Sequence, residues 1–295
     1  MLNLFQHFFF TTFVMMNKKI IFSAILLAFI ASCDYIAIPK EEYTPIPAPE
    51  DTIIRKILLE DYTGHRCPSC PNAHVQANSL KQQYGEQLVV IGVHAGSTSI
   101  PNPPLYLVDY RTTAGNAYDL FFTIPSYPKG MINRFGYPAN ANLLNWGSAW
   151  STTIASLVSL PVEANIEISF TLNGNLLDVT AKTQMLAEKT GPYKIVALIT
   201  EDSIVSPQDV NTIYTPNYVH RHVLRGTISD ANVWGSDLFL GTALAGDSIM
   251  WTFPTYTLGG GWDVNQLYVV VYIYDNNSTS PTYKEILQVE ERKLN

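Results

Sequence analysis

The sequence predicts two folded parts, an α/β domain followed by an all-β domain. Between residues 53 and 159, apolar segments with the character of strands and of helices alternate along the chain. From residue 160 to residue 295, short segments alternate apolar and polar residues with a period of two, and turn clusters separate them. We therefore place one domain at residues 53–159 and the second at residues 160–295.

The composition is that of a folded, mildly acidic protein. The chain has 295 residues, with 18 Lys and Arg against 25 Asp and Glu, which gives a formal net charge of −7. Charged residues make up 15% and aromatic residues 12%, a combination that argues against a disordered chain. No basic excess is available to neutralise phosphates, so the composition disfavours binding to nucleic acid.

The first 32 residues have the pattern of a signal peptide. Lys18-Lys19 precedes an apolar run over residues 20–30, and small residues follow this run. The run is shorter than the roughly 20 residues of a membrane-spanning helix. We expect Met15 or Met16 to be the true start codon, with residues 1–15 as overhang from the start-site assignment.

Ile30-Ala31-Ser32-Cys33 resembles a bacterial lipobox. This resemblance implies cleavage before Cys33 and acylation of that cysteine, and several lipid chains on one cysteine give a stable membrane anchor. The alternative is a plain secretory signal in which Cys33 lies near the cleavage site by chance. Residues 33–52 contain four prolines, which favour extended backbone, so we expect a lipid-anchored tether there.

The two remaining cysteines occur in Cys67-Pro68-Ser69-Cys70. Residues 53–62 predict a buried strand, and the pattern from Pro68 to Tyr84 predicts a helix. Cys67 would then lie at the positive end of the helix dipole, which stabilises a thiolate. A thiolate is the attacking species in thiol–disulfide exchange, and Cys70 is placed one turn along to resolve the mixed disulfide.

The neighbours of the cysteines suggest further roles. His65 and Arg66 add positive charge close to Cys67, which would support its thiolate. Zinc normally takes four ligands, and His65 and His74 could complete a site with the cysteines only by crowding one turn. His220-Arg221-His222 puts two imidazoles on one face of a strand without an acidic partner nearby in sequence. We expect no metal and, without a phosphate loop or dinucleotide fingerprint, no cofactor.

Strand, turn, C-x-x-C and helix in this order are typical of a thioredoxin-like fold. Thioredoxins place a cis-proline directly before a core strand beside the cysteines, and Pro128 matches that position; an ordinary trans-proline turn is the alternative. By the same resemblance, Asp61 falls where thioredoxins keep a buried carboxylate that would assist proton transfer from Cys70. A strand-end acid partly in water is the alternative for Asp61.

Several elements are expected around this motif and after it. A second buried strand is expected over residues 88–94, with helices over residues 114–122 and 141–158. Residues 162–172 alternate in the manner of a half-buried strand, and Asn173-Gly174 is a hairpin signal. Short strands without helix repeats favour an immunoglobulin-like sandwich for the second domain. Further strands are expected over residues 193–200, 248–253, 267–274 and 283–290.

Four segments together resemble a family of roughly 28-kDa outer-membrane lipoproteins of Gram-negative bacteria. These are the lipobox at Cys33, Leu59–Pro71, Pro128–Arg134 and Tyr218–Arg225. The likeness extends over nearly the whole mature chain. It implies outer-membrane placement and a thioredoxin-like domain followed by a β-rich domain. It implies no settled reaction, because the family is named for its location.

Two functions fit these patterns. The first is thiol–disulfide exchange on exported proteins, in which Cys67 reacts, Cys70 resolves and Pro128 binds the substrate backbone. It requires a reachable Cys67 sulfur with Pro128 close to it. The second is a cell-envelope binding or adhesion lipoprotein in which the thioredoxin-like domain is a non-catalytic scaffold. In both cases the lipid on Cys33 would hold the protein at the outer membrane, facing the periplasm or the cell surface.

Overall fold

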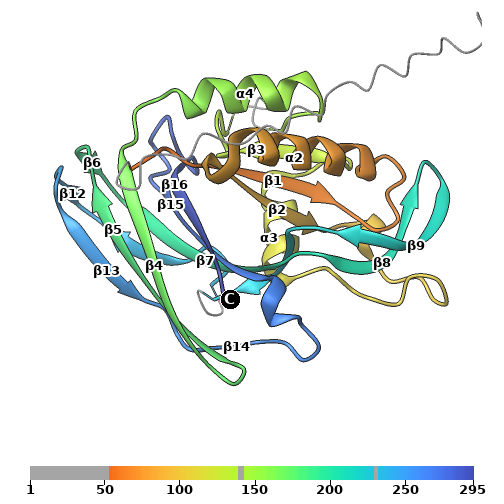
Figure 1. Cartoon of the computed structure of the whole chain (residues 1–295). Coiled ribbons are helices and arrows are strands. Elements are labelled where there is room, and N and C mark those ends of the chain that lie inside the picture. The colour runs from red at the N-terminus through yellow and green to blue at the C-terminus, as the bar shows by residue number, and fades with distance from the viewer. Residues whose placement is uncertain (1–52, 139–142, 229–231) are drawn as a thin grey trace, which may run out of the picture. The chain divides into compact units, whose positions relative to one another are not determined.

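The computed structural model describes residues 53–138, 143–228 and 232–295 (Figure 1). The expected signal peptide, the lipid site at Cys33 and the tether of residues 33–52 lie outside the described residues. The helices are α2 (Cys70–Tyr84), α3 (Thr113–Phe122) and α4 (Ser148–Val158). The strands are β1 (Ile57–Thr63), β2 (Leu88–His94), β3 (Lys129–Ile132), β4 (Ala164–Asn173), β5 (Leu176–Met185), β6 (Lys189–Thr190), β7 (Tyr193–Glu201), β8 (Ile204–Val210), β9 (Ile213–His220), β10 (Val223–Thr227), β11 (Ser236–Phe239), β12 (Thr242–Ala243), β13 (Ser248–Thr252), β14 (Tyr256–Thr257), β15 (Leu267–Asp275) and β16 (Ile286–Lys293).

The main sheet contains strands from both halves of the chain. Its order is β16-β15-β7-β10-β2-β1-β3, and β11 pairs with β7 as well. β1 runs parallel to β2 and antiparallel to β3. β10 joins β2 where Val223 faces Gly92, and the Gly92 N–H donates to the His222 carbonyl at 2.7 Å. The two domains expected on either side of residues 159 and 160 therefore share one sheet, instead of each having its own.

Both faces of the main sheet are covered, which explains why every residue of β1 is buried. α2 and α4 pack on one face of β1, β2 and β3 (Figure 1). On the same face, the small sheet of β4, β5, β13 and β14 packs against β7 and β15 through the alternate apolar residues of its strands. This part has the two packed sheets that a sandwich requires. α3 packs against the opposite face.

Two helix starts differ from the sequence expectation. α2 begins at Cys70, two residues later than expected, and Pro71 lies in its first turn. α4 begins at Ser148, whereas the sequence predicted a helix from residue 141. Residues 141 and 142 lie outside the described part, and Leu144 exchanges both backbone hydrogen bonds with Gly130 at the edge of β3. Leu144 therefore pairs with a strand, and the helix begins only after it.

The turn directly after β3 is hydrogen-bonded to strands at both ends of the main sheet. Asn133 and Arg134 both have positive φ, at 49° and 52°, which turns the chain back toward β1. The Asn133 N–H donates to the Leu58 carbonyl at 2.8 Å, and its side-chain oxygen accepts from the Leu58 N–H at 2.7 Å. The Asn133 carbonyl accepts from the N–H of Ile286 in β16 at 2.9 Å. The first and last strands of the sheet order therefore meet at this residue.

The turn aims Arg134 into the interior, where it meets Glu60 of β1. Both side chains are completely buried, and the guanidinium donates two hydrogen bonds to the carboxylate at 2.9 and 2.7 Å. It donates a third to the Tyr272 hydroxyl of β15 at 3.1 Å. Aromatic rings surround the cation, with the centres of the Tyr118 and Phe122 rings 5.0 and 5.1 Å away. Such a pair is tolerated in a core because its charge is shared in good geometry.

Removing the cation should leave Glu60 buried and unpaired. We expect Arg134→Met to lower the free energy of unfolding by about 3–5 kcal/mol. Chemical denaturation measures this change. The matched control is Lys182→Met, which breaks the exposed 3.5 Å pair with Glu167 and should cost less than about 1 kcal/mol. Equal losses in the two variants would contradict a structural role for the buried pair.

Candidate functional site

Cys67 and Cys70 form a disulfide in the connection between β1 and α2, with their Cα atoms 5.4 Å apart. Cys70 is the first residue of α2 and is fully buried. Cys67 is only 2% exposed. The sequence predicted the strand and helix on either side of the motif, but the reachable sulfur that it expected is covered in this structure.

The hairpin of β8 and β9 packs against the connection that contains Cys67. The Gln208 side-chain amide donates to the carbonyls of Gly64 and Cys67 at 3.2 and 3.0 Å. Backbone N–H groups of the hairpin donate to the His65 and Pro68 carbonyls, each at 2.9 Å. Sequence analysis did not identify this hairpin, because its Ile204–His220 segment lacks a clear alternating pattern.

The structure places His65 and Arg66, the two residues expected to support a thiolate, against neighbouring segments. His65 is buried and stacks on Tyr106 with ring centres 5.1 Å apart. Burial lowers the pKa of His65, which favours the neutral form of the ring. The Arg66 guanidinium donates to the Ser97 carbonyl at 2.5 Å, which holds the arginine on a neighbouring turn.

Pro128 lies at the same end of β1 as the disulfide connection. The Tyr127–Pro128 peptide bond is cis, as expected from the resemblance. Tyr62 of β1 faces Lys129 of β3, so Pro128 is one register step beyond and next to Thr63, where β1 ends. Pro128 is buried. The structure therefore brings Pro128 to the end of the strand from which the chain leads to Cys67.

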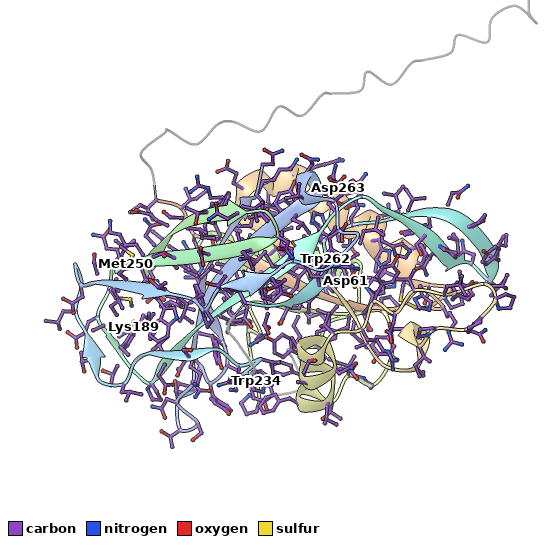
Figure 2. The ribbon with its side chains drawn as sticks, turned by 90° about the horizontal axis from the view of Figure 1, so that it is seen from below. Asp61, Lys189, Trp234, Met250, Trp262 and Asp263 are labelled. Carbon is purple, nitrogen blue, oxygen red and sulfur yellow. A yellow bond between two sulfur atoms is a disulfide. The ribbon has the colours of Figure 1, made fainter. Side chains whose placement is uncertain are left out.

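Asp61 is buried beneath α2, as the expected carboxylate behind the cysteines would be, and it is labelled in Figure 2. Burial raises the pKa of Asp61 to about 8, so the carboxyl is mostly protonated at pH 7. Its Oδ2 lies 3.8 Å from His74 Nε2. Burial lowers the pKa of His74 to about 3, so this contact joins two neutral groups. His74 is four residues after Cys70, on the same side of α2.

His74 connects helix α2 to the hairpin. Its Nε2 lies 2.8 Å from the Thr63 hydroxyl and its Nδ1 lies 2.7 Å from the Tyr218 hydroxyl of β9. Asp61, Thr63 and His74 also line a cavity of about 20 Å³, together with His94, His220 and His222. A polar cavity of this size has room for one water molecule.

The histidines of this cavity come from separate parts of the chain. The His94 and His220 rings lie 5.6 Å apart, and burial lowers the pKa of His220 to about 4. Within residues 53–138, 143–228 and 232–295, no three His, Cys, Asp or Glu side chains converge as a metal site requires. The sequence pointed to His220 and His222 as a pair, but gave no signal for their meeting His74 and His94.

Two solved structures resemble this chain over most of its length. HBP35 of Porphyromonas gingivalis matches with a TM-score of 0.65 at 16% identity, covering 82% of this chain and 76% of that one. A structural-genomics protein from Agrobacterium tumefaciens matches with a TM-score of 0.52 at 12% identity, covering 83% of this chain and 96% of that one. At these identities the likeness concerns the fold alone.

The family model "Outer membrane protein Omp28" matches residues 115–295, and the chain belongs to this family. The resemblance to an outer-membrane family is thereby confirmed, and membership supports placement at the outer membrane. The match includes Pro128 and the histidine segment at residue 220, but begins after the cysteine motif. No curated protein matches the chain. Among the helices of the described residues, none has the length and apolar character needed to cross a membrane.

The raised pKa of Asp61 predicts a pH-dependent stability. The folded protein keeps the proton up to about pH 8, whereas the unfolded carboxyl releases it near about pH 4. Asp61 therefore reduces stability increasingly across this window, by at most about 1.4 kcal/mol per pH unit. We expect Asp61→Asn to stabilise the oxidised protein more at about pH 8 than at about pH 5.

Denaturation of the wild type and the variant at several pH values measures this difference. The matched control is Asp178→Asn, which makes the same change of side chain at an exposed position of β5, where a substitution should alter stability by only about 0.5 kcal/mol. A gain for Asp61→Asn that stays constant between the two pH values would show that Asp61 ionises normally.

Proposed function

We propose that this protein exchanges thiols and disulfides with exported proteins at the outer membrane, using a thioredoxin-like arrangement of residues 53–159. The observation that carries the proposal is the Cys67–Cys70 disulfide between β1 and α2, with Asp61 buried under the same helix. The sheet order β2-β1-β3 and the cis bond before Pro128 support it. Fold similarity alone would not support a reaction.

In the proposed reaction, the thiolate of a client protein attacks Sγ of Cys67. A client–Cys67 bond forms, the Cys67–Cys70 bond breaks, and Cys70 leaves as a thiolate. The protonated carboxyl of Asp61 supplies the proton that Cys70 takes up, directly or through a water in the adjoining cavity. A second client thiolate then attacks the client sulfur and releases Cys67. The client dithiol is oxidised, and the protein disulfide is reduced.

Attachment through lipid on Cys33 completes the proposal. We expect Cys33→Ser to abolish incorporation of a labelled fatty acid and to move the protein from the membrane fraction to the soluble fraction, because one sulfur carries the lipid. The matched control is Cys67→Ser, which should keep both the label and the membrane fraction. Labelled Cys33→Ser protein would contradict anchoring at this residue.

Removing the resolving cysteine should trap clients. In Cys70→Ser, the exchange can run only in the reverse direction: the Cys67 thiolate attacks a client disulfide, a Cys67–client bond forms and one client thiolate leaves, with no Cys70 thiol to release the client. We therefore expect Cys70→Ser to accumulate mixed disulfides between Cys67 and exported proteins, seen as bands that disappear on reduction. Cys67→Ser/Cys70→Ser is the control and should form none. A Cys70→Ser protein that is folded, anchored and free of mixed disulfides in cells would count decisively against exchange.

A second candidate function is noncovalent binding at the cell envelope, and the burial of Cys67 favours it. Exposed apolar side chains lie in two neighbouring segments, Leu105 and Leu107 in the loop before α3 and Val205 and Ile213 in the hairpin, and the Tyr106–Asp209 hydrogen bond joins these segments. Here the disulfide is structural. Partners that remain bound to the Cys67→Ser/Cys70→Ser variant would favour this function over exchange.

A further inference from the structure

The hairpin of β8 and β9 is hydrogen-bonded to the backbone of the cysteine connection. It forms a two-stranded sheet of its own, outside the main sheet. The N–H of Asp209, in β8, donates to the His65 carbonyl, and the N–H of Asn211, in the turn after β8, donates to the Pro68 carbonyl. The Gln208 side chain donates to the carbonyls of Gly64 and Cys67. The hairpin therefore occupies the backbone carbonyl edge of residues 64–68.

The hairpin is held by polar and ring contacts, and it contributes no residue to the apolar clusters of the main sheet. Its buried side chains are Ser206, Gln208 and His220, and the His220 ring lies 5.4 Å from the Tyr110 ring. Exposed apolar residues lie on its outer side, where Val205 is 62% and Ile213 is 68% exposed. A segment that buries so little apolar surface can open locally at a small cost in free energy, while the core strands stay folded.

Gln208 provides the central attachment. Its completely buried amide nitrogen reaches three carbonyl oxygens, those of Gly64, Cys67 and Asp209. Among the residues that the structure describes, its side-chain oxygen has no hydrogen-bond partner. An unpaired buried oxygen disfavours the closed arrangement, because water would satisfy it when the hairpin lifts away.

Two hydroxyl contacts hold the hairpin at its sides. The Tyr106 hydroxyl donates to the Asp209 carboxylate at 2.5 Å. The Tyr218 hydroxyl lies 2.7 Å from His74 Nδ1 on α2. Neither contact involves the apolar clusters of the main sheet, so both can break without disturbing β1 or α2.

We infer that the β8–β9 hairpin is an internal cap that occupies the client-binding edge of residues 64–68 and must lift away before Cys67 can react. The client is an extended polypeptide segment that carries a cysteine. Its backbone N–H groups replace those of Asp209 and Asn211 on the His65 and Pro68 carbonyls. The identity of the client rests on the proposed function, whereas the opening of the cap can be measured without any client.

The first test is the rate at which dithiothreitol reduces the disulfide. One thiolate of this dithiol attacks Cys67, Cys70 leaves as a thiolate, and the second dithiol sulfur closes the ring and releases Cys67. Rapid alkylation and mass measurement count the free thiols. We expect Gln208→Ala to raise the rate constant about tenfold or more, because the central attachment is lost. The matched control, Val205→Ala on the outer side of β8, should stay within about twofold of the wild type.

Equal rate constants for the wild type, Gln208→Ala and Val205→Ala would contradict the inference that the hairpin is a cap.

The second test uses the unchanged protein, so that it does not depend on how well Gln208→Ala folds. We expect the amide hydrogens of Asp209 and Asn211 to exchange with solvent at least about 100-fold faster than those of Val196 and Leu198 in β7, because the cap opens locally. Equal protection at all four amides would show that the hairpin leaves only on global unfolding, and would overturn the inference.

The two proposals can fail separately. Faster reduction of Gln208→Ala, together with a Cys70→Ser variant that traps no client, supports the cap and contradicts the exchange function. Trapped clients, together with a reduction rate that Gln208→Ala leaves unchanged, support exchange and contradict the cap.

Discussion

The buried pair of Glu60 and Arg134 is the interaction on which the rest of the structure depends. Glu60 belongs to β1 and Arg134 to the turn after β3, while Tyr272 of β15 binds the same guanidinium and rings from α3 surround it. A charge cannot be buried alone without a large cost in free energy, so these elements must be in place together. The pair therefore couples the α/β half to the β-rich half, and it fixes the position of the strand that ends at the cysteine connection.

Around that rigid base, the structure distributes stability unevenly. The strands and helices next to the disulfide are held by two apolar clusters with fully buried members. The hairpin above the disulfide is held by a buried amide, two backbone hydrogen bonds and two hydroxyl contacts. If the hairpin opens locally, a reagent can reach the disulfide while β1 and α2 stay folded.

The groups beside the disulfide are titratable but uncharged. Burial raises the pKa of Asp61 to about 8 and lowers the pKa of His74 to about 3. Neutral groups in a small polar cavity can hold or pass on a proton without first separating charge, which suits a sulfur whose protonation changes during exchange.

The sequence by itself determined the local features of this protein. The strand before Cys67, the helix after Cys70, the position of the cis bond at Pro128 and strands β4, β7, β13, β15 and β16 follow from periodicity or motif, because neighbours in the chain create those signals. The shared sheet, the hairpin over Cys67 and the meeting of His74 with His220 were decided only by the tertiary structure. Each joins residues that are far apart along the chain, and what brings them together is burial: a polar group such as Gln208 or Arg134 must find a partner once apolar packing has removed it from water.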